Sequence, residues 1–146
     1  MNIIDGLNGL SRPQIGEMKI NISMFDRDEL LKHLTKMLTI RAAERKLAFG
    51  KKMKLIGGPV HLGVGQEAVA VGVAASLRTT DRVFGTHRSH AHLLSMDMDL
   101  RALFAETLGR KTGFSRGMGG SMHLWSQPNG FYGSVPIVSG TVPLAV

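Results

Sequence analysis

The segment from Gly109 to Gly140 restricts the possible folds most, because eight of its 32 residues are glycine. Glycine loses more backbone freedom on folding than any other residue, so this density is unfavourable inside packed helices and strands. It suits loops whose backbone turns sharply or approaches a ligand closely. The segment therefore predicts a region of glycine-rich loops, with residues 135–138 as a candidate short strand.

Helical patterns precede this region. A helix is predicted to begin near Ser23 or Asp26, where Asp26 and Glu29 form a capping-box-like start, and to end near residues 49–50. Its apolar residues at helical spacing predict a buried face made of Leu30, Leu31, Leu34, Met37, Leu38 and Ala42. A second helix is predicted over residues 66–77; it is apolar on almost every face and is therefore expected to pack inside the protein.

The remaining elements are short. Residues 82–86 are predicted to form a strand, and Asp99 is expected to cap a helix that stops at Gly109. Helices, short strands and glycine-rich turns indicate an α/β fold. Residues 141–146 read as the start of an apolar helix, and because termini usually lie at the surface, we expect the fold to continue beyond them. Residues 1–22 show no apolar period and predict an irregular amino-terminal arm.

Composition narrows the classes of function. The chain has no cysteine, which excludes disulfides, thiolate metal sites and cysteine nucleophiles and fits a reducing cytoplasm. No apolar run approaches the roughly 20 residues that span a bilayer, and no secretory signal is evident. The net charge of +7 suggests an anionic partner. A nucleic-acid-binding module is one interpretation, but the aromatic content of 5% argues against it.

Three motifs carry candidate chemistry. His61 lies just before a predicted helix start, where partial positive charge gathers. The sequence HRSHAH at residues 87–92 follows a strand, where α/β proteins bind ligands, and its Arg88 suits a phosphate. Residues 109–123 combine bare backbone amides with Arg and Lys and could cradle an anion. Each motif has an alternative interpretation. His61 could be a core histidine, and residues 87–92 could be a solvated turn or a zinc site. Residues 109–123 could be a flexible surface loop.

The order of the motifs is more specific than any one of them. HLGVGQEA, DRVFGTHRSHAH, GRKTGFSRGMGGSMH and FYGSVPIVSGTVPLAV together resemble the alpha subunit of the decarboxylating component of 2-oxo acid dehydrogenase complexes. The resemblance covers residues 27–146 and includes Arg41 and Glu44. It implies the amino-terminal half of a thiamine-diphosphate-binding α/β fold, a parallel sheet flanked by helices, with residues 23–146 as a partial cofactor-binding domain.

The resemblance also implies an activity. Such enzymes decarboxylate pyruvate or a related 2-oxo acid, or cleave acetoin, and pass the acyl group to a lipoyl carrier. The implied partners are a beta subunit and a lipoyl-bearing transacylase, in an alpha2beta2 heterotetramer, while exposed apolar surface predicts self-association of this chain alone. Neither a nucleic acid nor a membrane is an expected partner.

The family's magnesium ligands, a Gly-Asp-Gly motif and a later Asn, are not present in the sequence. We therefore expect the Mg²⁺ ligands beyond residue 146 and predict none within the chain. The chain alone is expected to bind thiamine diphosphate weakly and to be inactive. A non-catalytic interaction remnant of the family is the alternative interpretation.

Site residues follow from the resemblance position by position. Arg88 and His87 are expected to contact the diphosphate, and Ser126 matches a further position on the diphosphate side. His61 and His90 match histidines that line the active site, and they are predicted to be catalytic, either by steadying the substrate or by transferring protons.

Two more positions concern the aminopyrimidine ring of the cofactor. Pro136 and Val138 match residues whose backbone groups bind that ring in the family. Proline has no N–H, but residue 136 is expected to contribute only its carbonyl oxygen, so the residue is compatible with this role. Val138 is expected to contribute its amide.

Overall fold

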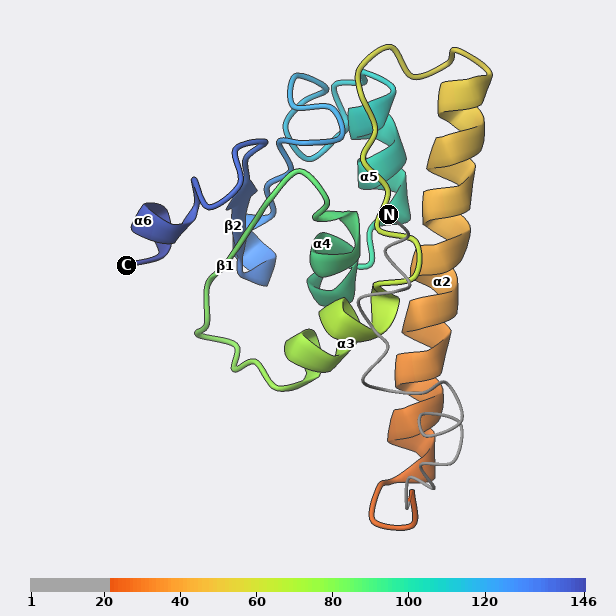
Figure 1. Ribbon diagram of the computed structural model, residues 1–146, viewed down its shortest axis with the longest axis vertical. Coiled ribbons are helices and arrows are strands. Elements are labelled where there is room, and N and C mark those ends of the chain that lie inside the picture. Colours follow the sequence, from red (N-terminus) through yellow and green to blue (C-terminus); the bar gives the residue numbers. More distant parts are fainter. Residues whose placement is uncertain (1–21) are drawn as a thin grey trace, which may run out of the picture. The chain divides into compact units, whose positions relative to one another are not determined.

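The computed structural model describes residues 22–146, so almost all of the predicted amino-terminal arm lies outside the described residues. Residues 31–146 form one compact unit, and residues 22–30 belong to a separate one. Figure 1 shows the elements in chain order along the colour gradient. They are α2 (Arg27–Lys52), α3 (Glu67–Ala75), β1 (Val83–Gly85), α4 (His90–Met96), α5 (Leu100–Thr107), the 3-10 helix η2 (Gln127–Asn129), β2 (Phe131–Ser134) and α6 (Val142–Ala145).

Helix α2 begins where the sequence predicts. The side chain of Asp26 accepts a hydrogen bond from the Asp28 amide at 3.0 Å, which satisfies one free N–H of the first turn. The helix continues to Lys52 rather than ending at Gly50. Gly50 is buried, and a Cβ atom there would lie 3.1 Å from the Ile56 side chain, so this glycine allows close packing instead of ending the helix.

The predicted buried face of α2 is mostly wrong, although its Met37 is partly buried and packs against the core. Leu31, Leu34 and Leu38 are 46%, 46% and 62% exposed. The buried residues of α2 are instead Ile40, Ala43, Glu44, Leu47 and Gly50. The helix carries two apolar stripes, and the stripe that packs is the one in its carboxyl-terminal half, which joins the core of the larger unit.

Helix α3 is also less buried than its composition predicts. Val69 and Val73 are 62% and 53% exposed, whereas Ala70 and Val71 are buried. Only one face of α3 therefore packs against other described residues, and the neighbouring element on that face is α4. An apolar composition all around a helix predicts burial only when every face has a neighbour.

The hydrophobic core draws on α2 to α5 and on β2. Its buried members are Ile40, Ala43, Leu47, Ile56, Ala70, Val71, Ala91, Leu93, Leu94, Leu103, Leu124 and Phe131. Asp99 caps α5 as predicted, since its carboxylate accepts the Ala102 amide at 2.9 Å, and Gly109 follows the helix with a φ of 68°. Among the helices of residues 22–146, none has the length and apolarity needed to cross a membrane.

Strands β1 and β2 form a two-stranded parallel sheet, with α4 and α5 in the connection between them (Figure 1). This mixture of helices and a small parallel sheet agrees with the predicted α/β class. The first predicted strand is confirmed, but the second is wrong, because β2 ends at Ser134. Pro136 has no N–H with which to continue the ladder. Parallel strands end at the same edge of a sheet, so the segments after Gly85 and Ser134 leave from one edge.

Candidate functional site

Three predicted site residues meet in the larger unit. The rings of His61 and His87 lie edge to face, with 4.8 Å between their centroids. The Arg88 Nη1 donates a hydrogen bond to the carbonyl of Leu62 at 2.8 Å. The loop before α3 and the loop after β1 therefore come together, and the guanidinium of Arg88 is exposed between them with most of its donors free for a ligand.

A hollow of about 340 Å³ lies beside this group; we call it the Arg88 hollow. Its lining consists of Gly63, Gln66, Val69, Arg88, Ala91 and His92. His92 and Gln66 belong to two of the quoted motifs, but neither is among the predicted site residues. His92 follows Arg88 by four residues, and the helical spacing of α4 could have indicated a shared face. Burial lowers the pKa of His92 below its ordinary value, so its ring favours the neutral form.

Several polar atoms near Arg88 lack partners. The Nδ1 atoms of His61 and His87 are buried and make no hydrogen bond to any described residue. Burying a polar atom without a partner costs free energy, so such atoms point to a water molecule or a ligand as their partner. Together with the free donors of Arg88, they form a group suited to an anion.

The loop before α3 is anchored by an ion pair. Arg41 of α2 donates to both carboxylate oxygens of Glu67, at 2.5 Å and 2.7 Å. The Gly65 amide donates to the same carboxylate at 3.1 Å. The hydrogen bonds from Arg41 are the main reason that the pKa of Glu67 falls from its ordinary 4.5 to about 2. Glu67 is therefore ionised near neutral pH, and the loop is held to α2.

A second anchor runs through Glu44. One oxygen of its buried carboxylate accepts the Gly63 amide at 3.1 Å, and the other lies 3.0 Å from the His90 Nδ1. The Nε2 of His90 lies 2.8 Å from the hydroxyl of Ser121 and 3.1 Å from its carbonyl oxygen. Arg41 and Glu44 therefore do not pair with each other. They lie three residues apart on α2 and hold successive parts of the same loop.

These contacts bear on the role of His90. The residue is fully buried, and both ring nitrogens already have partners. Nδ1 faces the Glu44 carboxylate and Nε2 faces both oxygens of Ser121, so neither ring nitrogen is open to a substrate. The geometry therefore favours a positioning role for His90, and its catalytic role stays a prediction.

The glycine-rich loop of residues 113–120, which we call the Glu106 loop, does form an anion cradle. The anion is the chain's own Glu106, whose side chain is fully buried. One oxygen accepts the amides of Ser115 and Gly117 at 2.6 Å and 2.9 Å. The other accepts the amides of Gly119 and Gly120 at 2.7 Å and 3.0 Å. The interpretation that these amides receive an external anion is therefore wrong.

The structure does not bring Ser126 to the Arg88 hollow. Ser126 pairs with Phe131, at the amino end of β2, whereas Arg88 follows the carboxyl end of β1. Its hydroxyl donates to Asp97 at 2.7 Å, and Asn129 donates to the same carboxylate oxygen. These bonds hold the turn before β2, so the geometry does not support the predicted diphosphate contact.

Pro136 and Val138 lie at the expected edge of the sheet. The Val135 amide donates to the Gly85 carbonyl at 3.2 Å, which keeps the segment after β2 beside the start of the loop that carries His87. Val138 is 69% exposed, and its amide donates to none of the described residues. Pro136 is exposed as well, and its carbonyl accepts no backbone hydrogen bond from the described residues.

The described part of the chain holds no group of three or more potential metal ligands. The histidines of HRSHAH point to different neighbours: His87 faces His61, and His90 faces Glu44 and Ser121. This divergence argues against the zinc alternative for the cluster.

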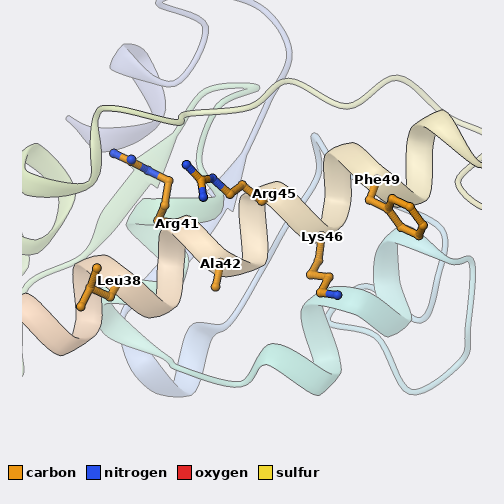
Figure 2. A pocket seen from close by; sticks show the side chains of 6 residues that line it. All are labelled: Leu38, Arg41, Ala42, Arg45, Lys46 and Phe49. Carbon is orange, nitrogen blue, oxygen red and sulfur yellow. The ribbon is translucent and has the colours of Figure 1, made fainter.

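Another hollow, of about 490 Å³, lies along α2 (Figure 2). It is lined by Leu38, Arg41, Ala42, Arg45, Lys46 and Phe49. All six side chains come from one helix, so this hollow is an open surface along one face of α2. None of the predicted site residues lines it, and we do not assign the site to it.

Comparison with known proteins agrees with the motifs. The profile of the family described as "Dehydrogenase E1 component" matches residues 35–146. The chain is 42% identical over 123 residues to the pyruvate dehydrogenase E1 component subunit alpha of Rhizobium meliloti (strain 1021), covering 84% of this chain and 35% of the relative. It is 43% identical over 120 residues to the subunit of the same name from Zymomonas mobilis, covering 82% of this chain and 34% of the relative.

A plant protein matches to a similar degree. The mitochondrial pyruvate dehydrogenase E1 component subunit alpha-1 of Oryza sativa subsp. japonica is 43% identical over 116 residues, covering 80% of this chain and 30% of the relative. The chain thus spans about a third of the length of the relatives it matches. With the family profile covering more than three quarters of its residues, the chain belongs to the dehydrogenase E1 component family.

Proposed function

We propose that this chain supplies the alpha-subunit side of a thiamine-diphosphate site in a pyruvate-decarboxylating E1 component. The observation that carries the proposal is the exposed guanidinium of Arg88 beside the Arg88 hollow, next to buried histidine nitrogens without partners. A guanidinium with free donors at one edge of a parallel sheet suits a phosphorylated ligand, and a histidine nitrogen beside it can add a hydrogen bond when it carries a proton. The relatives named above are pyruvate dehydrogenase alpha subunits, which favours pyruvate as the substrate.

The residues fit the diphosphate part of the cofactor. Arg88 would donate to phosphate oxygens with the donors that Leu62 does not use, and His87 would offer a ring nitrogen beside it. The carbonyl of Pro136 and the amide of Val138 would bind the aminopyrimidine ring. When bound, thiamine diphosphate supplies the electron sink that decarboxylation of a 2-oxo acid needs.

Magnesium fits less completely. The lining of the Arg88 hollow contains no Asp or Glu, and Mg²⁺ requires oxygen ligands in near-octahedral geometry. We propose that the metal ligands lie in the part of the protein that follows residue 146. For the same reason, the 146-residue chain alone is expected to bind thiamine diphosphate weakly and to be inactive.

The proposal includes partners. A beta subunit would complete the cofactor site in an alpha2beta2 heterotetramer, and the acyl group would pass to a lipoyl group on a transacylase. Acetoin is a second candidate substrate on the strength of the sequence motifs alone. A cytoplasmic location remains a prediction from the cysteine-free composition.

A chimera tests the proposed function. The aligned 123 residues of this chain would replace their counterpart in the Rhizobium meliloti alpha subunit, which would then be produced with its own beta subunit. We expect carbon dioxide release from pyruvate that depends on thiamine diphosphate and Mg²⁺. In the chimera, Arg88→Ala should weaken cofactor binding by about 10- to 100-fold, because a charge-assisted contact is lost.

Arg101→Ala is the matched control, since Arg101 is also an exposed arginine but lies on α5, outside the Arg88 hollow. It should leave cofactor binding unchanged. An assembled, folded chimera without activity would contradict the proposal, as would equal effects of the two arginine variants. Acetoin, supplied in place of pyruvate, distinguishes the two candidate substrates.

A further inference from the structure

The backbone of the Glu106 loop follows the Glu106 side chain closely. A Cβ atom on Gly113 would lie 2.4 Å from the Glu106 Cα, so only glycine fits there. Gly117 and Gly120 have φ values of 79° and 59°, in the left-handed region that favours glycine. The loop is thus shaped around a fixed negative charge, with four of its amides pointing at the two carboxylate oxygens.

The end of this loop holds a contact to His90. Gly120, whose amide donates to Glu106 at 3.0 Å, is followed directly by Ser121. Both oxygens of Ser121, the hydroxyl and the carbonyl, face the His90 Nε2 at 2.8 Å and 3.1 Å. The position of the His90 partner therefore depends on where Glu106 holds the preceding residue.

His90 connects this loop with the candidate site. It is the first residue of α4 and lies two residues after Arg88. Its other nitrogen faces Glu44, which also holds the Gly63 amide. The Arg88 guanidinium donates to the neighbouring Leu62 carbonyl. A continuous series of hydrogen bonds and covalent links thus joins Glu106 with His90, two residues after Arg88, and with the Leu62 carbonyl that accepts from Arg88.

We propose that Glu106 is a positioning residue for this site. Its carboxylate acts as a built-in anion that orders the Glu106 loop and, through Ser121 and His90, fixes where Arg88 stands. The identity of the ligand that Arg88 binds rests on the proposed function. The coupling between Glu106 and His90 does not depend on it. The proposal assigns the glycines of the loop to the support of the ligand-binding residues rather than to ligand binding itself.

The test compares two carboxylates in the full 146-residue chain by NMR of its histidine ring nitrogens. Glu106→Gln should shift or broaden the His90 ring signals, because an amide cannot accept hydrogen bonds at both ends. Asp97→Asn is the matched control, since Asp97 also holds a turn, through Ser126 and Asn129, but has no contact with His90. Unchanged His90 signals in a folded Glu106→Gln chain, or equal changes in both variants, would overturn the proposal.

Chemical rescue adds a readout that general loss of structure would not produce. Glu106 is fully buried but borders a hollow of about 380 Å³ together with Gly119, Gly120 and Ser121, so removing its side chain should open the cradle towards that hollow. Glu106→Ala removes the equivalent of one acetate ion. Adding sodium acetate should restore the His90 signals in this variant, whereas sodium chloride at equal ionic strength should not. Failure of acetate to restore them in a folded chain would overturn the role of the anion.

A measurement on the unaltered chain covers the case in which the variants do not fold. The four amides that face Glu106 should exchange with solvent at least about tenfold more slowly than those of exposed Lys111 and Thr112. Equal exchange rates would overturn the proposal, because they would show that the carboxylate does not hold the loop.

The chimera described above separates this inference from the proposed function. There, Glu106→Gln should weaken thiamine diphosphate binding by about tenfold, as loss of an indirect positioning contact does at other sites. An unaltered chimera that never binds the cofactor would contradict the proposed function and leave the NMR result standing. Normal cofactor binding by the Glu106→Gln chimera would overturn the positioning role alone.

Discussion

Two loops rich in glycine meet near His90, and they satisfy their polar groups in opposite ways. The Glu106 loop closes around a buried carboxylate of its own chain, which uses four of its amides. The loop of residues 61–66 leaves the Arg88 hollow open, with histidine nitrogens unpaired beside it. Both loops are therefore rich in glycine, but buried polar atoms without partners occur only beside the loop of residues 61–66, which can receive a ligand.

The largest effect on stability is expected in the closed loop. Glu106→Gln should lower the free energy of unfolding by about 3–5 kcal/mol, because amides buried against a carboxylate lose their acceptor. Glu29→Gln, a change of the same kind at an exposed position, should stay within about 0.5 kcal/mol. Urea titrations of the two variants measure the difference. A loss below about 1 kcal/mol in Glu106→Gln would mean that the loop does not depend on the charge.

Replacing two glycines by alanine should change the free energy of unfolding in opposite directions. A Cβ atom on Gly119 would lie 2.1 Å from the His123 carbonyl oxygen, so Gly119→Ala should destabilise the chain by about 1–3 kcal/mol. Gly72 lies within α3 with nothing within 4 Å of its added Cβ, so Gly72→Ala should stabilise the chain by about 0.5–1 kcal/mol. Thermal unfolding of both variants is a direct check. Destabilisation by Gly72→Ala would show that α3 is packed more tightly than described.

A smaller, pH-dependent effect is expected at the anchor of the open loop. The pKa of Glu67 is about 2 in the folded chain and ordinarily 4.5, so the unfolded chain binds a proton at higher pH. Its contribution to stability is therefore fully present above pH 4.5 and is lost as pH falls towards 2. Unfolding midpoints measured from pH 6 to pH 2 should fall less steeply in Glu67→Gln than in the unaltered chain. Parallel curves would contradict the Arg41 pairing.

The smallest effect on stability is expected at the open site itself. Arg88 is exposed and makes one hydrogen bond to Leu62, so Arg88→Ala should change the free energy of unfolding by less than about 0.5 kcal/mol. The same change should strongly weaken cofactor binding in the chimera. Denaturant titration and calorimetry on one preparation would show this contrast. A large loss of stability would place Arg88 among the structural residues instead.

Sequence reasoning succeeded where local chemistry decides the structure. The start of α2 at Asp26, the strand that includes Val83–Gly85, and the helix between Asp99 and Gly109 follow from side-chain caps and short-range pattern. The proximity of His61, His87 and Arg88 could be expected from their places before a helix and after a strand.

Sequence reasoning failed where contacts between residues far apart in the chain determine the structure. The sequence shows two apolar stripes on α2, and nothing local indicates that the Ile40 and Leu47 stripe packs while Leu38 stays exposed. Glu106 precedes the first amide it holds by nine residues and the last by 14, so its role depends on a loop path that no spacing rule predicts. The predicted diphosphate contact of Ser126 stays a prediction without geometric support, since its hydroxyl donates to Asp97, 29 residues earlier in the chain.

The two-stranded sheet has one further consequence. On the side of β2 away from β1, the Leu124 carbonyl and the Ser126 backbone form hydrogen bonds with β2. Among residues 22–146, the only strand paired with β1 is β2. Helix α6 also contacts β1, so a further strand could pair with β1 only where α6 leaves its outer edge uncovered. Such an addition would widen the sheet on the side away from β2, and the carboxyl-terminal edge, where Arg88 and Val138 emerge, would stay uncovered.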